Sequence, residues 1–348
     1  MLTRLFSNTF KNPPNTKCVI WFVTLVSGLV ASWLILLEGG RIGDDSVLYL
    51  EVARLFSIGA WKDGIALYHW PLYPALITLV HQLTGLNLQY SALLLSVPLY
   101  MLASYAFCRL IIEAGGHSKT LWAGALLLFS CTYITRDILP MIMRDQGFWA
   151  FYLCSLLFLL RFYKQNRWQD SLLWQVCTIV AVLFRVEGIT YLMLLPFIML
   201  TRTECSLRER VKHLAAAQSL TLLGAVTVIL GLLTIPSLKF SDLGRLDESF
   251  TVLQRAYLQL SHGLIDKAHI IGDQVLGSFL SDYGMQGLIL TLIAIIIGKV
   301  AGASGWPSLL LACMPIKPDN PSPGTEVRRF FYWVMGLGLV NLCVILLS

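Results

Sequence analysis

Long uninterrupted apolar segments restrict this chain more than any other feature. A helix that crosses the hydrocarbon core of a bilayer, about 30 Å thick, needs roughly 20 apolar residues. Such segments occur at 18–37, 87–112, 119–139, 146–163, 214–236, 286–300 and 328–347. Hydrophobic residues make up 56% of the chain and charged residues only 13%, whereas soluble domains carry about 25% charged residues. A soluble globular enzyme is therefore excluded, and an all-α polytopic membrane protein is expected.

Charge and cysteine content exclude two further classes of protein. The formal charge of +6 comes from 26 basic and 20 acidic residues, with no basic run that could follow a phosphate backbone. No nucleic-acid partner is therefore expected. The eight cysteines stand singly, without a Cys-x-x-Cys pair. This is typical of small apolar core residues, and not of a metal site or a disulfide framework.

Flanking charges indicate how the segment 168–201 crosses the membrane. It holds two short apolar runs, with basic clusters before it and after it: Arg161, Lys164 and Arg167, then Arg202, Arg208, Arg210 and Lys212. The positive-inside rule places both clusters in the cytoplasm, so an even number of crossings lies between them. We expect a hairpin, 168–184 outward and 188–201 back, with Arg185 and Glu187 at its outer tip.

The complete predicted topology has about nine spans, a cytoplasmic N-terminus and two outer loops, at 38–86 and 237–285. In the first loop, the apolar run 71–84 is too short to span and is expected at the interface. The chain 1–348 is expected to form a single integral-membrane domain with C-terminal spans in 286–348. The sequence has no Asn-x-Ser/Thr glycosylation acceptor, which favours a bacterial inner membrane.

Ionisable side chains gather at the predicted outer ends of the spans, and mid-span positions are nearly all uncharged. The charged positions are Asp44, Asp45, Arg136, Asp137, Arg144, Asp145, Arg185 and Glu187. Transporters and pumps instead carry ionisable residues near the bilayer midplane. The pattern therefore predicts a site at the outer, periplasmic or exterior, surface of the membrane.

Two adjacent aspartates follow the first span directly. The spacing of apolar residues predicts an amphipathic interfacial helix over 44–58, with Asp44 and Asp45 at its N-terminus. Aspartate is a favoured N-cap, and the helix dipole stabilises it there. One carboxylate is enough for a cap, however, and a second carboxylate beside it suits a general base or a metal ligand. Spacing alone leaves both interpretations open.

Three other positions also allow a structural or a functional interpretation. Arg144 and Asp145 could be an N-cap with its salt-bridge partner. Arg185 and Glu187 could form an interfacial ion pair, but an arginine at the membrane surface also suits a lipid-borne phosphate. His69 has no second ligand nearby in the sequence, which makes a metal site there the minor interpretation.

These motifs, in this order, resemble the GT-C superfamily of membrane glycosyltransferases, in particular its family-39-like and RgtA/B/C/D-like branch. The motifs are Asp44-Asp45-Ser46 with Tyr49, Gly59-Ala60-Trp61, His69-Trp70-Pro71-Leu72-Tyr73-Pro74, Arg144-Asp145 and Phe184-Arg185-Val186-Glu187-Gly188. The resemblance marks 41–201 as the catalytic core of a GT-C-like helix bundle. The chain departs from many relatives at Ser46, where they have Glu, and at Val186, where they have Pro.

The resemblance implies a hexosyl- or pentosyltransferase that inverts the anomeric carbon. Its donor would be a polyprenyl-phosphate sugar, and its acceptor a lipid, a glycan or a protein at the outer face of the membrane. Such an activity would belong to polysaccharide biosynthesis in the cell envelope. Two alternatives remain: a flippase or transporter of lipid-linked sugars, and a non-catalytic subunit of a polysaccharide assembly complex.

The resemblance also implies roles for individual residues. Asp45 would be the catalytic base with Asp44 beside it, and Asp145 would be a second catalytic carboxylate. In some branches these carboxylates hold a divalent cation, so Asp45 and Asp145 would be the ligands of Mg or Mn. Arg185 would bind the donor phosphate. The other predicted substrate-binding residues are Glu187, Arg144, Tyr49 and His69.

Overall fold

The computed structural model describes residues 15–38, 40–202, 205–234, 295, 327 and 329–338. Across this part of the chain the backbone forms helices and no strand. The α-helices are α2 (Thr16–Glu38), α3 (Asp44–Ser57), α4 (Trp61–Leu67), α5 (Leu72–Thr84), α6 (Leu88–Glu113), α7 (Ser118–Ser130), α8 (Asp145–Gln165), α9 (Trp168–Phe184), α10 (Ile189–Leu194), α11 (Leu207–Ala217) and α12 (Ser219–Thr234). Short helical segments of other types are η1 (Tyr133–Ile138), η2 (Val186–Gly188) and η3 (Leu195–Thr201).

Three of the described helices, α2, α6 and α8, are long and apolar enough to cross a membrane. They coincide with the predicted spans at 18–37, 87–112 and 146–163. The helix α9 and the apolar segment Val186–Thr201 are shorter, and their bounds match the two arms of the predicted hairpin. That the two arms cross the membrane stays a prediction.

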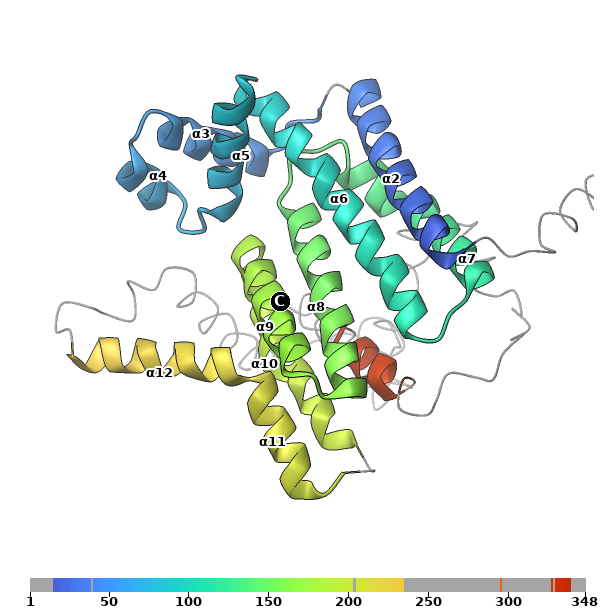
Figure 1. The fold of residues 1–348 in the computed structure, drawn as a ribbon. Helices are drawn as coiled ribbons and strands as arrows, with labels where there is room; N and C mark the ends of the chain where they lie inside the picture. The colour runs from blue at the N-terminus through green and yellow to red at the C-terminus, as the bar shows by residue number, and fades with distance from the viewer. Residues whose placement is uncertain are drawn as a thin grey trace, which may run out of the picture.

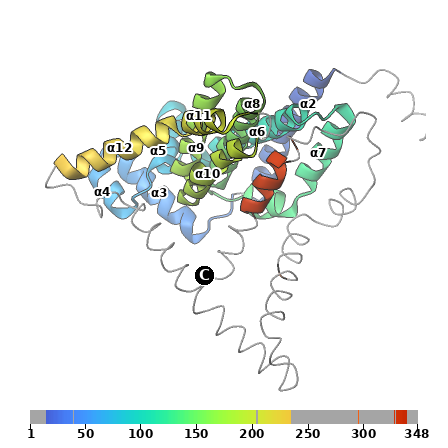
Figure 2. The ribbon, with the colours of Figure 1, turned by 90° about the horizontal axis from the view of Figure 1, so that it is seen from below.

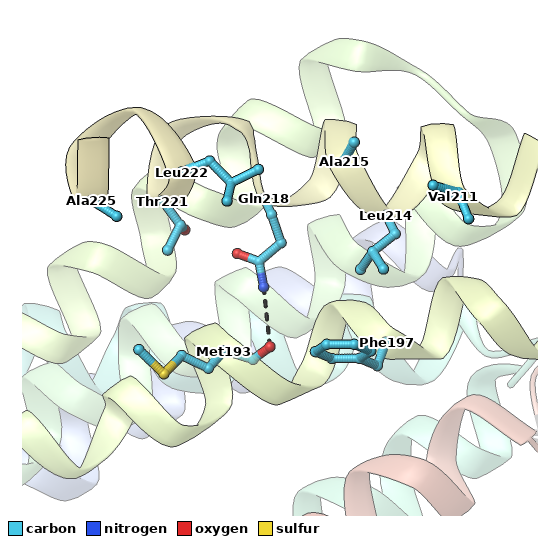
Figure 3. Close-up of a pocket in the computed structure, with 9 residues that line it drawn as sticks. All are labelled: Met193, Phe197, Val211, Leu214, Ala215, Gln218, Thr221, Leu222 and Ala225. Atoms are coloured by element: carbon cyan, nitrogen blue, oxygen red, sulfur yellow. Dashed lines mark hydrogen bonds between the residues drawn. The ribbon is translucent and has the colours of Figure 1, made fainter. Parts of the chain in front are cut away.

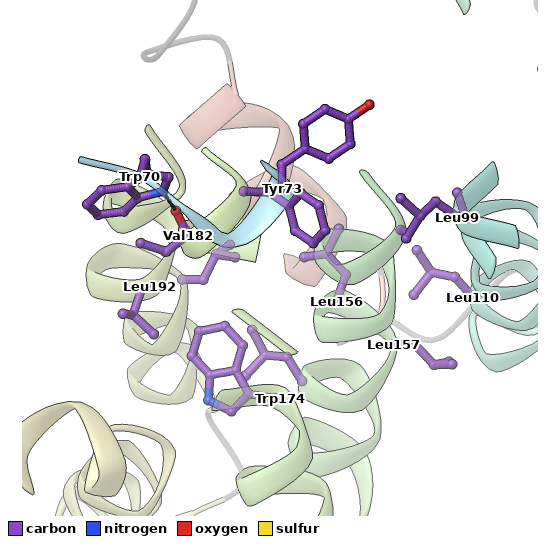
Figure 4. Packing of buried hydrophobic residues seen from close by; sticks show 14 of the residues in the cluster. Trp70, Tyr73, Leu99, Leu110, Leu156, Leu157, Trp174, Val182 and Leu192 are labelled. Carbon is purple, nitrogen blue, oxygen red and sulfur yellow. Dashed lines mark hydrogen bonds between the residues drawn. The ribbon is translucent and has the colours of Figure 1, made fainter. Parts of the chain in front are cut away.

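The long helices pack side by side around a common core. The helix α6 contacts both α2 and α8, and α8 contacts α9 over most of its length. Large apolar side chains fill the core, among them Tyr73, Leu156 and Trp174 (Figure 4). The short helices α3, α4 and α5 lie together at the end of the bundle where α8 begins and α9 ends (Figure 1).

The predicted span 119–139 is not one continuous helix. The helix α7 ends at Ser130, and a π-helical turn follows. Side-chain hydroxyls bind backbone carbonyls at this break: Ser130 Oγ donates to Leu127 at 3.3 Å, and Thr135 Oγ1 donates to Cys131 at 3.1 Å. Such local bonds compete with a regular helix.

The predicted span 214–236 is interrupted near its start, at Gln218 between α11 and α12, and α12 covers most of the rest. Side chains of α9 form hydrogen bonds with backbone groups on either side of Gln218. Trp174 Nε1 donates to the Ala217 carbonyl at 2.8 Å, and the Leu220 N–H donates to Gln175 Oε1 at 2.7 Å. The helix α12 then projects beyond the packed helices in both views (Figures 1 and 2).

Several predictions concern residues outside the described part of the chain. These are the outer loop at 237–285 and, apart from Ile295, the span at 286–300. Of the predicted last span, residues 329–338 are described and are helical.

Candidate active site

The first turn of α3 is bound to the segment that leads into α8. The Gly43 N–H donates to Ser46 Oγ at 3.1 Å, and that hydroxyl donates to the Ile142 carbonyl at 3.0 Å. A second link joins the Arg41 N–H to the Pro140 carbonyl at 2.8 Å. Through these bonds, motifs about 100 residues apart in the sequence lie at the same end of the bundle.

Neither aspartate of the first motif is a helix cap. The N-cap of α3 is Gly43, and the side chain that bonds back to its N–H belongs to Ser46. Asp44 and Asp45 instead occupy the first turn, where the positive end of the helix dipole favours an ionised carboxylate. Both are exposed. The capping interpretation is therefore wrong, and both carboxylates are accessible to a substrate.

Asp145, the first residue of α8, binds Arg185 at the end of α9. Its carboxylate accepts a hydrogen bond from the Arg185 guanidinium. Arg185 also donates to Glu187, from Nη2 to Oε1 at 3.2 Å and from Nε to Oε2 at 3.5 Å. The Asp145 side chain is only 9% exposed, and the Arg185 side chain 33%. One arginine is thus held between two carboxylates, with part of its guanidinium open to solvent.

The ion pairs shift the pKa values of Arg185 and Glu187. Burial alone would lower the pKa of Arg185, but the charge of Asp145 and the bonds to Glu187 raise it above its ordinary value. Burial alone would raise the pKa of Glu187, but the bonds and charge of Arg185 lower it. Both groups are therefore charged at neutral pH.

Arg144 does not pair with its neighbour Asp145. It donates instead to the hydroxyl of Tyr68, so the interpretation of Arg144 and Asp145 as a cap with its own ion-pair partner is wrong. The rings of Tyr68 and Tyr49 meet edge to face with centroids 5.5 Å apart. Burial raises the pKa of Tyr49. The positive charge of Arg144 lowers this pKa in part, and the nearby Tyr68 and Asp45 raise it. The Tyr49 hydroxyl therefore remains protonated.

His69 is exposed, whereas its neighbours Tyr68 and Trp70 are buried. The indole N–H of Trp70 donates to the Val182 carbonyl at 2.9 Å, near the end of α9. The predicted substrate-binding residues did not include Tyr68 or Trp70. The partners of these aromatic residues are distant in the sequence, so no local pattern could reveal them.

That Asp45 and Asp145 hold a divalent cation stays a prediction. Cations such as Mg and Mn need several oxygen ligands, and Asp145 already binds Arg185. Among the residues that the structure describes, no group of three or more His, Cys, Asp or Glu side chains is placed to hold a metal ion.

An apolar groove of about 470 Å³ lies between α10 with η3 and the pair α11 and α12 (Figure 3). Its walls include Met193, Phe197, Leu214 and Leu222. Gln218 crosses the groove and donates from Nε2 to the carbonyls of Leu192 and Met193, both at 3.1 Å. The α10 end of this groove is six residues after Glu187.

Part of this chain is similar to a known protein family. Residues 68–229 match the family model described as dolichyl-phosphate-mannose-protein mannosyltransferase, a family of the GT-C superfamily. No curated protein and no solved structure matches the chain significantly. The matched residues include Tyr68, Arg144, Asp145, Arg185 and Glu187, whereas the first acidic motif precedes them. The match agrees with the resemblance seen in the sequence: residues 68–229 are similar to a family of GT-C membrane glycosyltransferases.

Proposed function

We propose that this protein transfers a sugar from a polyprenyl-phosphate donor to a hydroxyl group of a lipid, glycan or protein acceptor. The match to a dolichyl-phosphate-mannose-dependent family supports a lipid-phosphate sugar as the donor. Motifs from the first loop, the start of α8 and the end of α9 meet at one end of the bundle, as a site at the membrane surface requires. We place this end at the outer face of a bacterial inner membrane.

The proposed reaction exchanges one bond at the anomeric carbon for another. The acceptor oxygen attacks this carbon, and the bond from the carbon to the donor phosphate oxygen breaks. The polyprenyl phosphate leaves with the electron pair of that bond, and the acceptor proton passes to the Asp45 carboxylate. Attack on the face opposite the phosphate inverts the configuration of the carbon.

The observation that carries this proposal is the position of Arg185. Three of the five N–H groups of its guanidinium are directed at Asp145 and Glu187. Among the described contacts, two N–H groups remain for a phosphate oxygen. The carboxylates fix the plane of the guanidinium before the substrate arrives, so the donors need little reorganisation as charge develops on the leaving phosphate. Arg144 adds a second positive charge at the same end of the bundle.

The apolar groove supports a lipid-linked donor. A phosphate at Arg185 would lie at the start of α10, and this helix leads from Glu187 to Met193 in the groove wall. Several isoprene units could follow α10 into the groove, where the walls are almost entirely apolar. Burial of hydrocarbon would then add affinity that does not depend on the identity of the sugar.

The test is sugar transfer by purified protein in lipid. Labelled sugars on a panel of polyprenyl-phosphate donors are offered together with lipid, glycan and peptide acceptors. We expect transfer by the wild type and a loss of about 100-fold or more in Arg185→Ala, because one transition-state donor group is removed. Arg54→Ala is the matched control, because Arg54 is an exposed arginine paired to Glu51 at 2.7 Å.

Two results would contradict the proposal. If Arg54→Ala and Arg185→Ala retained equal activity, Arg185 would not bind the donor. If the folded wild type transferred no sugar from any donor, a stand-alone enzyme would be excluded. Movement of the labelled lipid between leaflets would then identify a flippase, and its absence would favour a non-catalytic subunit.

A further inference from the structure

The segment Tyr68–Trp70 contacts Arg144 directly, and it also contacts the end of the helix that precedes Arg185. Tyr68 accepts a hydrogen bond from Arg144, and Trp70 binds the last turn of the helix that carries Arg185. We propose that this segment is a positioning element that sets the two arginines relative to each other so that both reach one lipid phosphate. This inference rests on the proposed function and assigns roles to two residues outside the catalytic groups.

Packing holds the Tyr68 ring in place independently of Arg144. Its residue is only 4% exposed, and its ring lies edge to face on Tyr49 with centroids 5.5 Å apart. The ring of Tyr49 in turn lies edge to face on Tyr73 with centroids 5.3 Å apart. Such aromatic pairs restrict the rings on both sides. The Tyr68 hydroxyl is therefore a fixed acceptor, and it limits where the long Arg144 side chain points.

Trp70 fixes the end of α9. The last carbonyls of a helix lack partners within the helix, and the indole of Trp70 supplies one to Val182 at 2.9 Å (Figure 4). Three residues later, Arg185 ends the helix, with its N–H donating to the Ala181 carbonyl at 2.9 Å. Trp70 thus holds the turn from which the Arg185 side chain projects.

Both contacts come from one short stretch of chain. Tyr68 has extended backbone, with φ −146° and ψ 106°, and the chain bends at His69. Tyr68 and Trp70 are both buried, while His69 is exposed. Arg144 is the N-cap of α8, and Arg185 is the C-cap of α9. A link between the two helix ends through this segment therefore determines how far apart the two guanidinium groups lie.

The test is a double-mutant cycle on the affinity for undecaprenyl phosphate, measured on full-length protein in lipid nanodiscs. We expect Tyr68→Phe to weaken binding by about threefold to tenfold in the wild type. In an Arg144→Ala background we expect the same substitution to have no effect, because Tyr68 acts through Arg144. An equal loss in both backgrounds would overturn the role of Tyr68.

Trp70 has a matched control. Trp70→Phe and Trp174→Phe each remove a buried indole that donates to a carbonyl at the end of a helix, at 2.9 Å and 2.8 Å. Trp70→Phe is expected to weaken undecaprenyl phosphate binding by about threefold to tenfold, and more than Trp174→Phe, whose indole bonds to Ala217 beside the groove. Equal effects of the two substitutions would show that Trp70 contributes only to stability.

Hydrogen exchange separates this inference from the proposed function. Trp70→Phe is expected to speed exchange of the amides of Arg185 and Gly188 more than Trp174→Phe does, whether or not the lipid phosphate binds. If the wild type did not bind undecaprenyl phosphate, the proposed donor would be wrong, and exchange alone would decide the positioning role. Unchanged exchange at these amides would overturn it.

Discussion

Asp145 and Arg185 are 40 positions apart in the sequence, and their side chains form an ion pair that joins the start of α8 to the end of α9. The pair has both a structural and a chemical consequence. It ties two packed helices together at one end, and it holds a guanidinium ready for an anion. Substitution of either residue is therefore expected to affect stability and activity together.

Asp145→Asn is expected to lower the free energy of unfolding by about 2 kcal/mol, since it removes a charge-assisted hydrogen bond at a buried carboxylate. Thermal unfolding in detergent measures this change. Asp137→Asn is the control, because Asp137 is an exposed aspartate in the segment that precedes α8. Equal melting temperatures for the two variants would show that the ion pair contributes nothing to stability.

Asp45→Asn is expected to reduce sugar transfer by about 100-fold to 10,000-fold, the usual contribution of a general base. Asp44→Asn provides the comparison, because it removes the same charge from the same exposed helical turn. We expect a much smaller effect there. Initial rates at saturating donor measure both variants. If Asp44→Asn had the larger effect, the roles of the two aspartates would be exchanged.

The ion pair of Glu187 predicts a pH dependence of stability. The folded state lowers the pKa of Glu187, so the unfolded chain binds more protons in the acid range, and stability rises with pH there. This contribution is complete above the ordinary glutamate pKa of about 4.3 and is lost as the pH falls through the lowered value. The melting temperature, measured from pH 3 to pH 7, should therefore rise more steeply with pH in the wild type than in Glu187→Gln. An equal dependence of melting temperature on pH in both proteins would contradict this prediction.

Gly147→Ala is expected to destabilise the protein by about 1–3 kcal/mol through overpacking. A Cβ atom at this position would overlap Cε1 of the buried Phe184 ring. Gly224→Ala is the control, since a Cβ there meets nothing within 4 Å and alanine favours a helix by about 1 kcal/mol. Thermal unfolding should therefore shift down for the first variant and not for the second.

Much of the helical framework could be predicted from the sequence. The apolar run 168–184 is bounded by Arg167 and Arg185 and forms a helix with those limits. The predicted helix over 44–58 is α3, which ends at Ser57. In both cases the spacing of apolar residues and the flanking polar residues carry the signal.

The breaks in the helices could not be predicted from local pattern. Gln218 lies in a long apolar segment, and the bonds that end α11 come from Trp174 and Gln175, more than 40 positions earlier. The same holds in the site, where Tyr68 and Trp70 find partners 76 and 112 positions away. Tertiary contacts of this kind leave no periodicity in the sequence.

Two sets of bonds join the middle of α9 and its last turn to different parts of the chain. Trp174 and Gln175 bind the turn between α11 and α12, and Val182 binds Trp70. Each added or deleted residue shifts a helix by about 1.5 Å and turns it by about 100°. One insertion between Gln175 and Val182 would therefore rotate one set of contacts away from its partners, and Arg185 would face another direction.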